Sequence, residues 1–168
     1  MIPRLILILI VFICFPIFSY SQTDTVNIEH DDHENAWFEI GVSTGPVYLL
    51  EEREFTTGFH THISKRLKQI PLSIGLGYEY VIDEHQHHSF GAVFGYTLVR
   101  DFTVSVSPGL RTSNGSLQFT SHFEATYGWD LNDRLHLGPL IEYAYGKNDN
   151  HITVGAHLGI LVNRRHKH

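Results

Sequence analysis

The feature that most constrains the fold is an alternation of apolar and polar residues with a period of two, which recurs eight times along the chain. Successive side chains of a β-strand point to opposite faces, so each run predicts a strand with one apolar and one polar face. No segment with a helical period competes, and the fold class is therefore predicted to be all-β. The predicted strands span residues 37–49, 55–66, 70–82, 88–99, 102–112, 117–131, 135–146 and 152–163.

The links between these runs are short clusters of turn-forming residues, such as Arg100-Asp101 and Asn132-Asp133. Short links join antiparallel neighbours, whereas parallel strands need long crossovers. Eight is also an even number of strands that can close into a ring. The sequence therefore predicts a single eight-stranded antiparallel up-and-down β-barrel.

The positions of the four lysines indicate which face of this barrel points inward. A soluble barrel and a membrane barrel share the alternation but place opposite faces inside. Lys65, Lys68, Lys147 and Lys167 all lie at strand ends, in turns or in the tail, so the polar strand face is small and mostly uncharged. This pattern fits a narrow lumen and assigns the apolar face to lipid, which predicts a transmembrane barrel.

The chain begins with features of a secretory signal peptide. An apolar run from Leu5 to Phe18 follows Arg4 and ends in Ser19-Tyr20-Ser21, with small residues suited to cleavage after Ser21. The run is shorter than the roughly 20 residues that a spanning helix needs. We expect a cleaved signal at 1–21, a flexible acidic leader at 22–35, the barrel at 36–163 and a basic tail at 164–168.

The single cysteine, Cys14, lies within the predicted signal peptide. The mature chain would then have no thiol, which excludes disulfides, thiolate metal sites and a cysteine nucleophile.

The eight runs, the tight turn Leu131-Asn132-Asp133-Arg134 and the segment from Gly138 to Gly146 resemble the small outer-membrane β-barrel superfamily. The plan is similar to the transmembrane domain of outer-membrane protein A, and the likeness covers about 36–163. It implies a location in the outer membrane, with lipid as the partner and a periplasmic N-terminus. One departure is the tail to His168, because many members of the family end in a C-terminal aromatic residue.

Histidine is abundant, with 13 residues in the chain, and one group lies in the predicted leader and tail. Imidazole and carboxylate side chains in a flexible segment can bind Zn, Ni, Cu or Co. The alternative is a solvated acidic linker. The candidate ligands of this group are His30, Asp31, Asp32, His33, His166 and His168.

A second group consists of His85, His87 and His88, in the predicted outer loop between the third and fourth strands. Weak cation capture at the rim and an ordinary exposed loop are equally good interpretations.

A third group falls on the inward face. An eight-stranded barrel is narrow enough for side chains to meet across its interior. Buried carboxylates there must pair with Arg111, with imidazolium or with a metal, or else be protonated. A hydrogen-bonded plug is the favoured interpretation, and a divalent-metal site or a proton-linked ion path is the functional alternative. The candidate residues are His60, His62, His122, Glu124, Glu142 and His157, with Glu39 and Glu79 on the same face.

The function predicted from these features is non-enzymatic: a structural or interaction role, with divalent-metal binding as the sharpest specific hypothesis. The alternative is a lipid A or phospholipid-modifying enzyme, since His87 and Ser89 share a strand face as a base and a nucleophile would. No oxyanion-hole motif accompanies them. No phosphate-binding loop or basic stripe is present, so nucleic acid is not an expected partner, and no protein partner is identified. A conducting porin is disfavoured because lumens of this strand number are normally filled.

Overall fold

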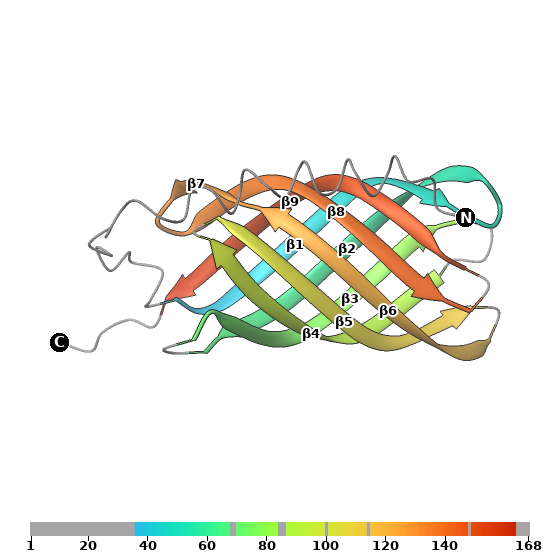
Figure 1. The fold of residues 1–168 in the computed structure, drawn as a ribbon, viewed down its shortest axis with the longest axis horizontal. Helices are drawn as coiled ribbons and strands as arrows, with labels where there is room; N and C mark the ends of the chain where they lie inside the picture. Colours follow the sequence, from blue (N-terminus) through green and yellow to red (C-terminus); the bar gives the residue numbers. More distant parts are fainter. Residues whose placement is uncertain are drawn as a thin grey trace, which may run out of the picture. The chain divides into compact units, whose positions relative to one another are not determined.

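The computed structural model describes residues 36–67, 70–83, 87–99, 101–113, 115–147 and 149–163. The predicted signal peptide, leader and tail lie outside these residues, as does His85. Nine strands are present in this part of the chain (Figure 1). They are β1 (Ala36–Leu49), β2 (Glu54–Arg66), β3 (Leu72–Ile82), β4 (His87–Val99), β5 (Phe102–Ser113), β6 (Ser116–Tyr127), β7 (Trp129–Asn132), β8 (Leu135–Gly146) and β9 (His151–Asn163).

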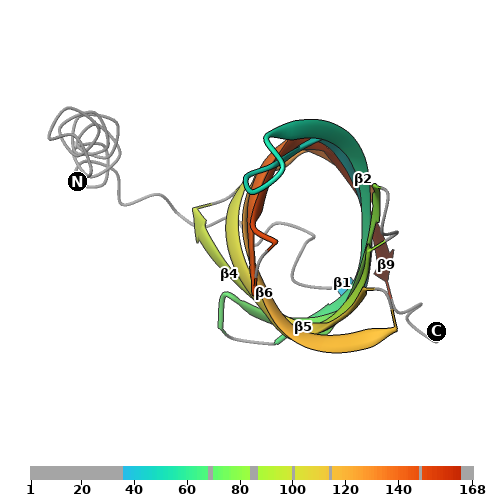
Figure 2. The same cartoon turned by 90° about the vertical axis from the view of Figure 1, so that its right-hand side faces the viewer.

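The strands form one closed antiparallel ring. Each barrel strand pairs with its sequence neighbour, β1 pairs with β9, and β6 and β7 both pair with β8. Figure 2 shows this ring along its axis. β6 and β7 are two parts of one barrel strand interrupted at Gly128, so the described residues form an eight-stranded barrel. The predicted fold class is confirmed, and the strand limits agree to within two residues apart from this interruption.

Large hydrophobic side chains face outward on every strand. Phe55 and Leu76 are examples, at 77% and 67% exposed. Ser, Thr, His and carboxylate side chains are buried inside, whereas buried apolar residues such as Val47 and Val81 are few. This arrangement confirms that the apolar face points outward, and it is the distribution that a lipid-embedded barrel requires. Within the described ranges, no helix is long and apolar enough to cross a membrane.

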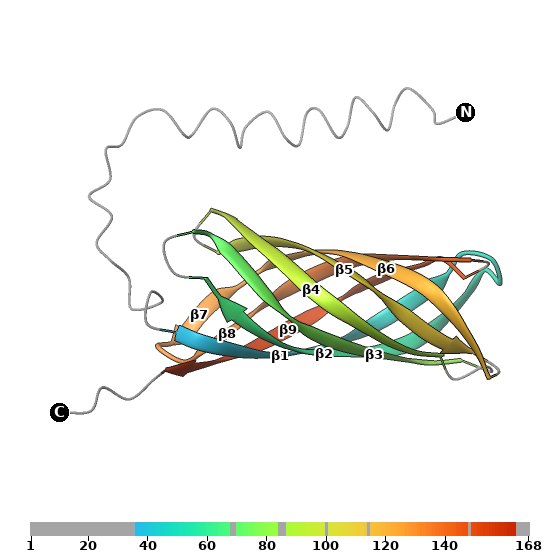
Figure 3. The ribbon, with the colours of Figure 1, turned by 90° about the horizontal axis from the view of Figure 1, so that it is seen from below.

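The two ends of the barrel carry different turns. We call the end where β1 begins and β9 finishes the terminal end; it also carries the β2–β3, β4–β5 and β7–β8 turns. The far end carries the β1–β2, β3–β4, β5–β6 and β8–β9 turns. In Figure 3 the terminal end lies at the left and the far end at the right.

Candidate functional site

Ten ionisable side chains form a connected series inside the barrel, from the far end to the middle of the lumen. We call this series the luminal plug. Its members are Asp83, His87, Arg111, Asp149, His151, Glu79, His122, Glu142, His60 and Glu124.

The plug begins at the far end, around Asp149 in the β8–β9 turn. Arg111 of β5 forms an ion pair with the Asp149 carboxylate and donates a hydrogen bond to its backbone carbonyl, with 3.3 Å between Nη1 and O. His87 Nδ1 lies 3.0 Å from Asp149 Oδ2 and 2.7 Å from Asp83 Oδ2. Burial raises the pKa of Asp149, but hydrogen bonds from His151 and His87 and the Arg111 charge outweigh it and hold that pKa below its usual range. Asp149 is therefore a firmly anionic centre for this end of the lumen.

In the middle of the lumen, imidazoles alternate with carboxylates. His151 Nε2 lies 3.1 Å from Glu79 Oε1, and the other oxygen of Glu79 lies 3.6 Å from His122 Nε2. The Nδ1 atom of His122 is 3.0 Å from Glu142 Oε1. His122 thus bridges two carboxylates that come from different strands.

The last members of the plug are His60 and Glu124. His60 Nδ1 lies 3.4 Å from Glu142 Oε2 and 3.3 Å from Glu124 Oε2. Thr126 donates a hydrogen bond of 2.9 Å to the other oxygen of Glu124. Glu124 also lines the cavity that occupies the terminal end of the lumen, so the plug ends where that cavity begins.

The charges of the plug are matched in number. Five carboxylates face one guanidinium and four imidazoles, so the plug is neutral overall when these imidazoles are protonated. Isolated charges in such a buried place would be costly, and pairing removes most of that cost.

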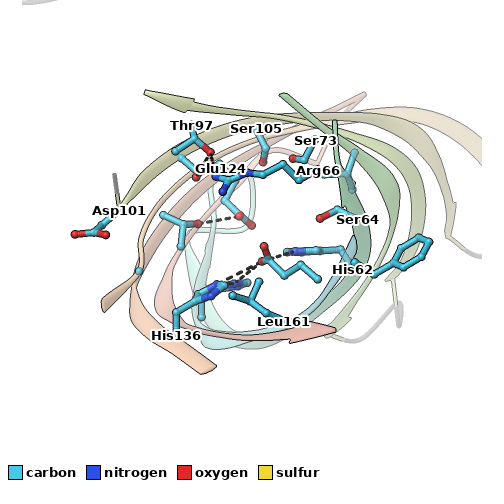
Figure 4. Close-up of a pocket in the computed structure, with 18 of the residues that line it drawn as sticks. His62, Ser64, Arg66, Ser73, Thr97, Asp101, Ser105, Glu124, His136 and Leu161 are labelled. Carbon is cyan, nitrogen blue, oxygen red and sulfur yellow. Dashed lines mark hydrogen bonds and ion pairs between the residues drawn. The ribbon is translucent and has the colours of Figure 1, made fainter. Parts of the chain in front are cut away.

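A separate group at the terminal end contains three imidazoles and one carboxylate, and we call it the terminal histidine cluster. Glu39 Oε1 lies 3.5 Å from His62 Nε2, 3.4 Å from His136 Nε2 and 3.4 Å from His157 Nε2. His136 Nε2 and His157 Nε2 are 3.3 Å apart. Figure 4 shows His62 and His136 pointing toward the same carboxylate from opposite walls of the lumen.

Strand register explains why these side chains meet. His62 on β2 is opposite Gly41 on β1, Gly41 is opposite Gly159 on β9, and Gly159 is opposite His136 on β8. The four residues form one row across four neighbouring strands, with a histidine at each end and two glycines between them. The absence of side chains at the glycines leaves room for both rings to turn inward.

The terminal histidine cluster borders a cavity of about 120 Å3, which Glu39, His62, His136 and His157 line together. The rim residue Arg66 is exposed and the Glu39 side chain is 29% exposed, so solvent reaches the cavity at the terminal end of the lumen. The space beside His60 and His122 in the plug is only about 10 Å3, about the least that can hold one water molecule. The lumen is therefore open at one end and filled beyond it.

The structure divides the predicted luminal candidates between the two groups. His60, His122, Glu124 and Glu142 meet in the plug. His62 and His157 lie in the terminal histidine cluster instead. The sequence analysis did not include His136, His151 or Asp149 among the luminal residues. His136 lies within the predicted strand 135–146, where strand parity places it on the same face as Glu142, and His151 would have joined the inward face had the last strand been extended by one residue.

The predicted outer-loop group needs a correction. His87 is the first residue of β4 and is 6% exposed, so it is a buried part of the plug and not a rim residue. Two interior carboxylates, those of Asp83 and Asp149, contact its Nδ1 atom and stabilise the ring inside the barrel. His88 points to the opposite face, where its Nδ1 lies 2.8 Å from the Tyr78 hydroxyl oxygen and its ring stacks on Tyr80.

No family model matches the chain, and no curated protein matches it by sequence. Solved structures do match by fold. The crystal structure of neisserial surface protein A is 13% identical, with a TM-score of 0.57, and the match covers 74% of this chain and 97% of that one. A de novo designed transmembrane β-barrel is 16% identical, with a TM-score of 0.51, covering 73% and 94% of the two chains. The chain therefore has the fold of the small eight-stranded outer-membrane β-barrels.

Proposed function

We propose that this protein is a small integral outer-membrane β-barrel with a non-enzymatic, structural or partner-binding role. The observation that carries the proposal is a lumen blocked by the charge-paired plug inside a wall whose outer face is apolar. In this proposal the terminal end faces the periplasm, as expected for barrels of this plan whose two chain ends lie at the same end. In this proposal the plug closes the lumen, so the barrel does not act as a pore.

Conductance across planar lipid bilayers tests the closed barrel. Purified protein, with membrane insertion verified by heat-modified gel mobility, is expected to give no stable single-channel current. A variant with His60, His122 and Glu142 all replaced by Ser loses the bulk of the plug and is expected to conduct. Stable channels from the unaltered protein would contradict the proposal.

We also propose that the luminal histidines and carboxylates bind a divalent metal ion of the Zn, Ni, Cu or Co type. Support comes from three sets of imidazole and carboxylate atoms, with the atoms of each set within 4.8 Å of one another. The sets are Glu39, His62 and His157; Glu79, His122, Glu142 and His151; and His60, Glu124 and Glu142. Nitrogen and oxygen donors of this kind suit borderline divalent ions.

Elemental analysis and calorimetric titration of the mature protein with each ion test this proposal. A matched variant replaces His30, His33, His166 and His168 with Ala. Binding that survives these replacements belongs to the barrel. Binding that disappears with them belongs to the leader and tail, and would refute a luminal site.

The enzyme alternative gains no support from the surroundings of His87 and Ser89. Both side chains are buried on the inward face of β4, away from the apolar exterior. The Nδ1 atom of His87 lies against two carboxylates of the plug. A lipid substrate on the outer surface would have to cross the barrel wall to reach them.

A further inference from the structure

We propose that Glu39, His62, His136 and His157 form a four-coordinate zinc-type site at the open end of the lumen, and that the luminal plug is not a metal site. This inference rests on the proposed metal binding and assigns it to one of the candidate groups. It also adds His136 as a ligand.

Four of the six separations between the donor atoms match the edges of a coordination tetrahedron. Zinc bonds to imidazole nitrogen and carboxylate oxygen at about 2.0–2.1 Å, which places tetrahedral ligand atoms about 3.3–3.4 Å apart. The Glu39 oxygen lies 3.4 to 3.5 Å from each of the three Nε2 atoms, and one Nε2–Nε2 pair is 3.3 Å apart. Glu39, His62 and His157 also offer ligand atoms within 4.8 Å of one another, so the separations of His62 from the other two imidazoles set how far the site must adjust to enclose an ion.

Three imidazole nitrogens of the cluster converge on a single carboxylate oxygen. His136 Nε2 and His157 Nε2 face each other at 3.3 Å. Glu39 Oε1, 3.4 Å from each of these nitrogens, is the acceptor that both would share if both carried protons. Three protonated imidazoles around one carboxylate would also leave uncompensated buried charge. A metal ion replaces those protons and uses all four donors at once.

The plug differs from the terminal histidine cluster in both charge and space. Each of its imidazoles already contacts two carboxylates, and its five carboxylates are matched by five basic groups. The space beside His60 and His122 is about 10 Å3, against about 120 Å3 beside the terminal histidine cluster. An ion entering the plug would have to displace ion pairs that are already formed.

Access also favours the terminal end. The Glu39 side chain is 29% exposed, whereas that of Glu142 is 2% exposed. An ion can reach Glu39 through the open cavity without any strand separating. A donor set of three nitrogens and one oxygen selects Zn2+ and Co2+ over Ca2+ and Mg2+, which prefer oxygen ligands.

The test uses full-length mature protein in detergent, with the four leader and tail histidines replaced by Ala in every sample. Zn2+ binding is measured by calorimetry, and Co2+ binding by the intense visible absorption of four-coordinate cobalt. His136→Gln and His157→Gln are compared with the matched plug variant His122→Gln. Heat-modified gel mobility verifies that each variant forms a barrel.

We expect one ion per barrel, a four-coordinate Co2+ spectrum, and a loss of affinity of at least about tenfold in the His136 and His157 variants. His122→Gln should bind like its parent. Loss of binding only in His122→Gln would overturn this assignment and leave metal binding by the lumen standing. No binding by the parent would overturn both. A six-coordinate Co2+ spectrum would refute the tetrahedral site alone.

Discussion

Gly41 and Gly159 lie directly opposite each other in the β1–β9 ladder, beneath the rings of the terminal histidine cluster. A Cβ atom at Gly41 would overlap the His62 ring and lie 2.6 Å from His157 Cε1. A Cβ atom at Gly159 would overlap the His136 ring. The two glycines thus provide the space in which three imidazoles converge on one carboxylate.

Gly159→Ala is expected to weaken Zn2+ binding while the barrel still forms. The added methyl group occupies the position of His136 Nε2, so that ring must turn away from Glu39. We expect an affinity loss of about tenfold or more by calorimetry. Gly77→Ala is the control, because its Cβ would lie 3.0 Å from Val93 Cγ2 and 3.1 Å from His60 Nε2, which a small shift relieves. Equal affinities in the two variants would contradict the proposed role of His136.

Arg111→Met should strongly destabilise the barrel. It removes the only guanidinium of the plug and leaves the buried Asp149 carboxylate with imidazole partners alone. Breaking a buried ion pair costs about 3 to 5 kcal/mol of the free energy of unfolding, which urea titration in lipid vesicles measures. Arg134→Met, at an exposed turn residue, should change it little. A loss no greater than that of Arg134→Met would show that the pair does not stabilise the barrel.

The contribution of Asp149 to stability should disappear in acid. Its pKa is below the usual range in the folded barrel and about 3.9 in an unfolded chain, so its stabilisation is complete above that value. It then declines as the pH falls toward the lower folded-state pKa. The difference in unfolding free energy between the parent and Asp149→Asn, measured from about pH 7 to about pH 3, should therefore shrink below about pH 4. A difference that stays constant would be inconsistent with a lowered pKa.

An arginine substitution on the outer face should lower the free energy of unfolding more when it lies nearer the middle of the bilayer. Phe94 lies in the middle of β4 and is 48% exposed, whereas Phe55 lies near the far end of β2. Phe94→Arg is expected to reduce the free energy of unfolding in vesicles by about 2 to 4 kcal/mol, and Phe55→Arg by about 0 to 1 kcal/mol. Similar losses at both positions would argue against the assigned orientation in lipid.

The fold could be predicted from the sequence because each strand has its own alternating pattern of apolar and polar residues. Period-two alternation identifies both the strand and its inward face, and the short links restrict the pairing to neighbours. The break between Tyr127 and Trp129 was not predicted, because the alternation continues through Gly128.

The division of the lumen into two groups could not be predicted in the same way. Which residues meet depends on how far each strand is shifted against the next around a tilted barrel, and no local pattern specifies that shift. His136 comes soon after the β7–β8 turn and His151 begins β9, so both resembled end residues. Register nevertheless places His136 in the same row as His62, which lies well inside β2.

The plug also has a mechanical consequence for the barrel wall. Its residues come from β2, β3, β4, β5, β6, β8 and β9, or from the turns beside them, so ion pairs connect opposite sides of the ring seen in Figure 2. Lateral pressure from lipid could flatten this ring only by separating opposite charges in a low-dielectric interior. The area that the protein occupies in a bilayer is therefore set by the side chains inside it as much as by its backbone.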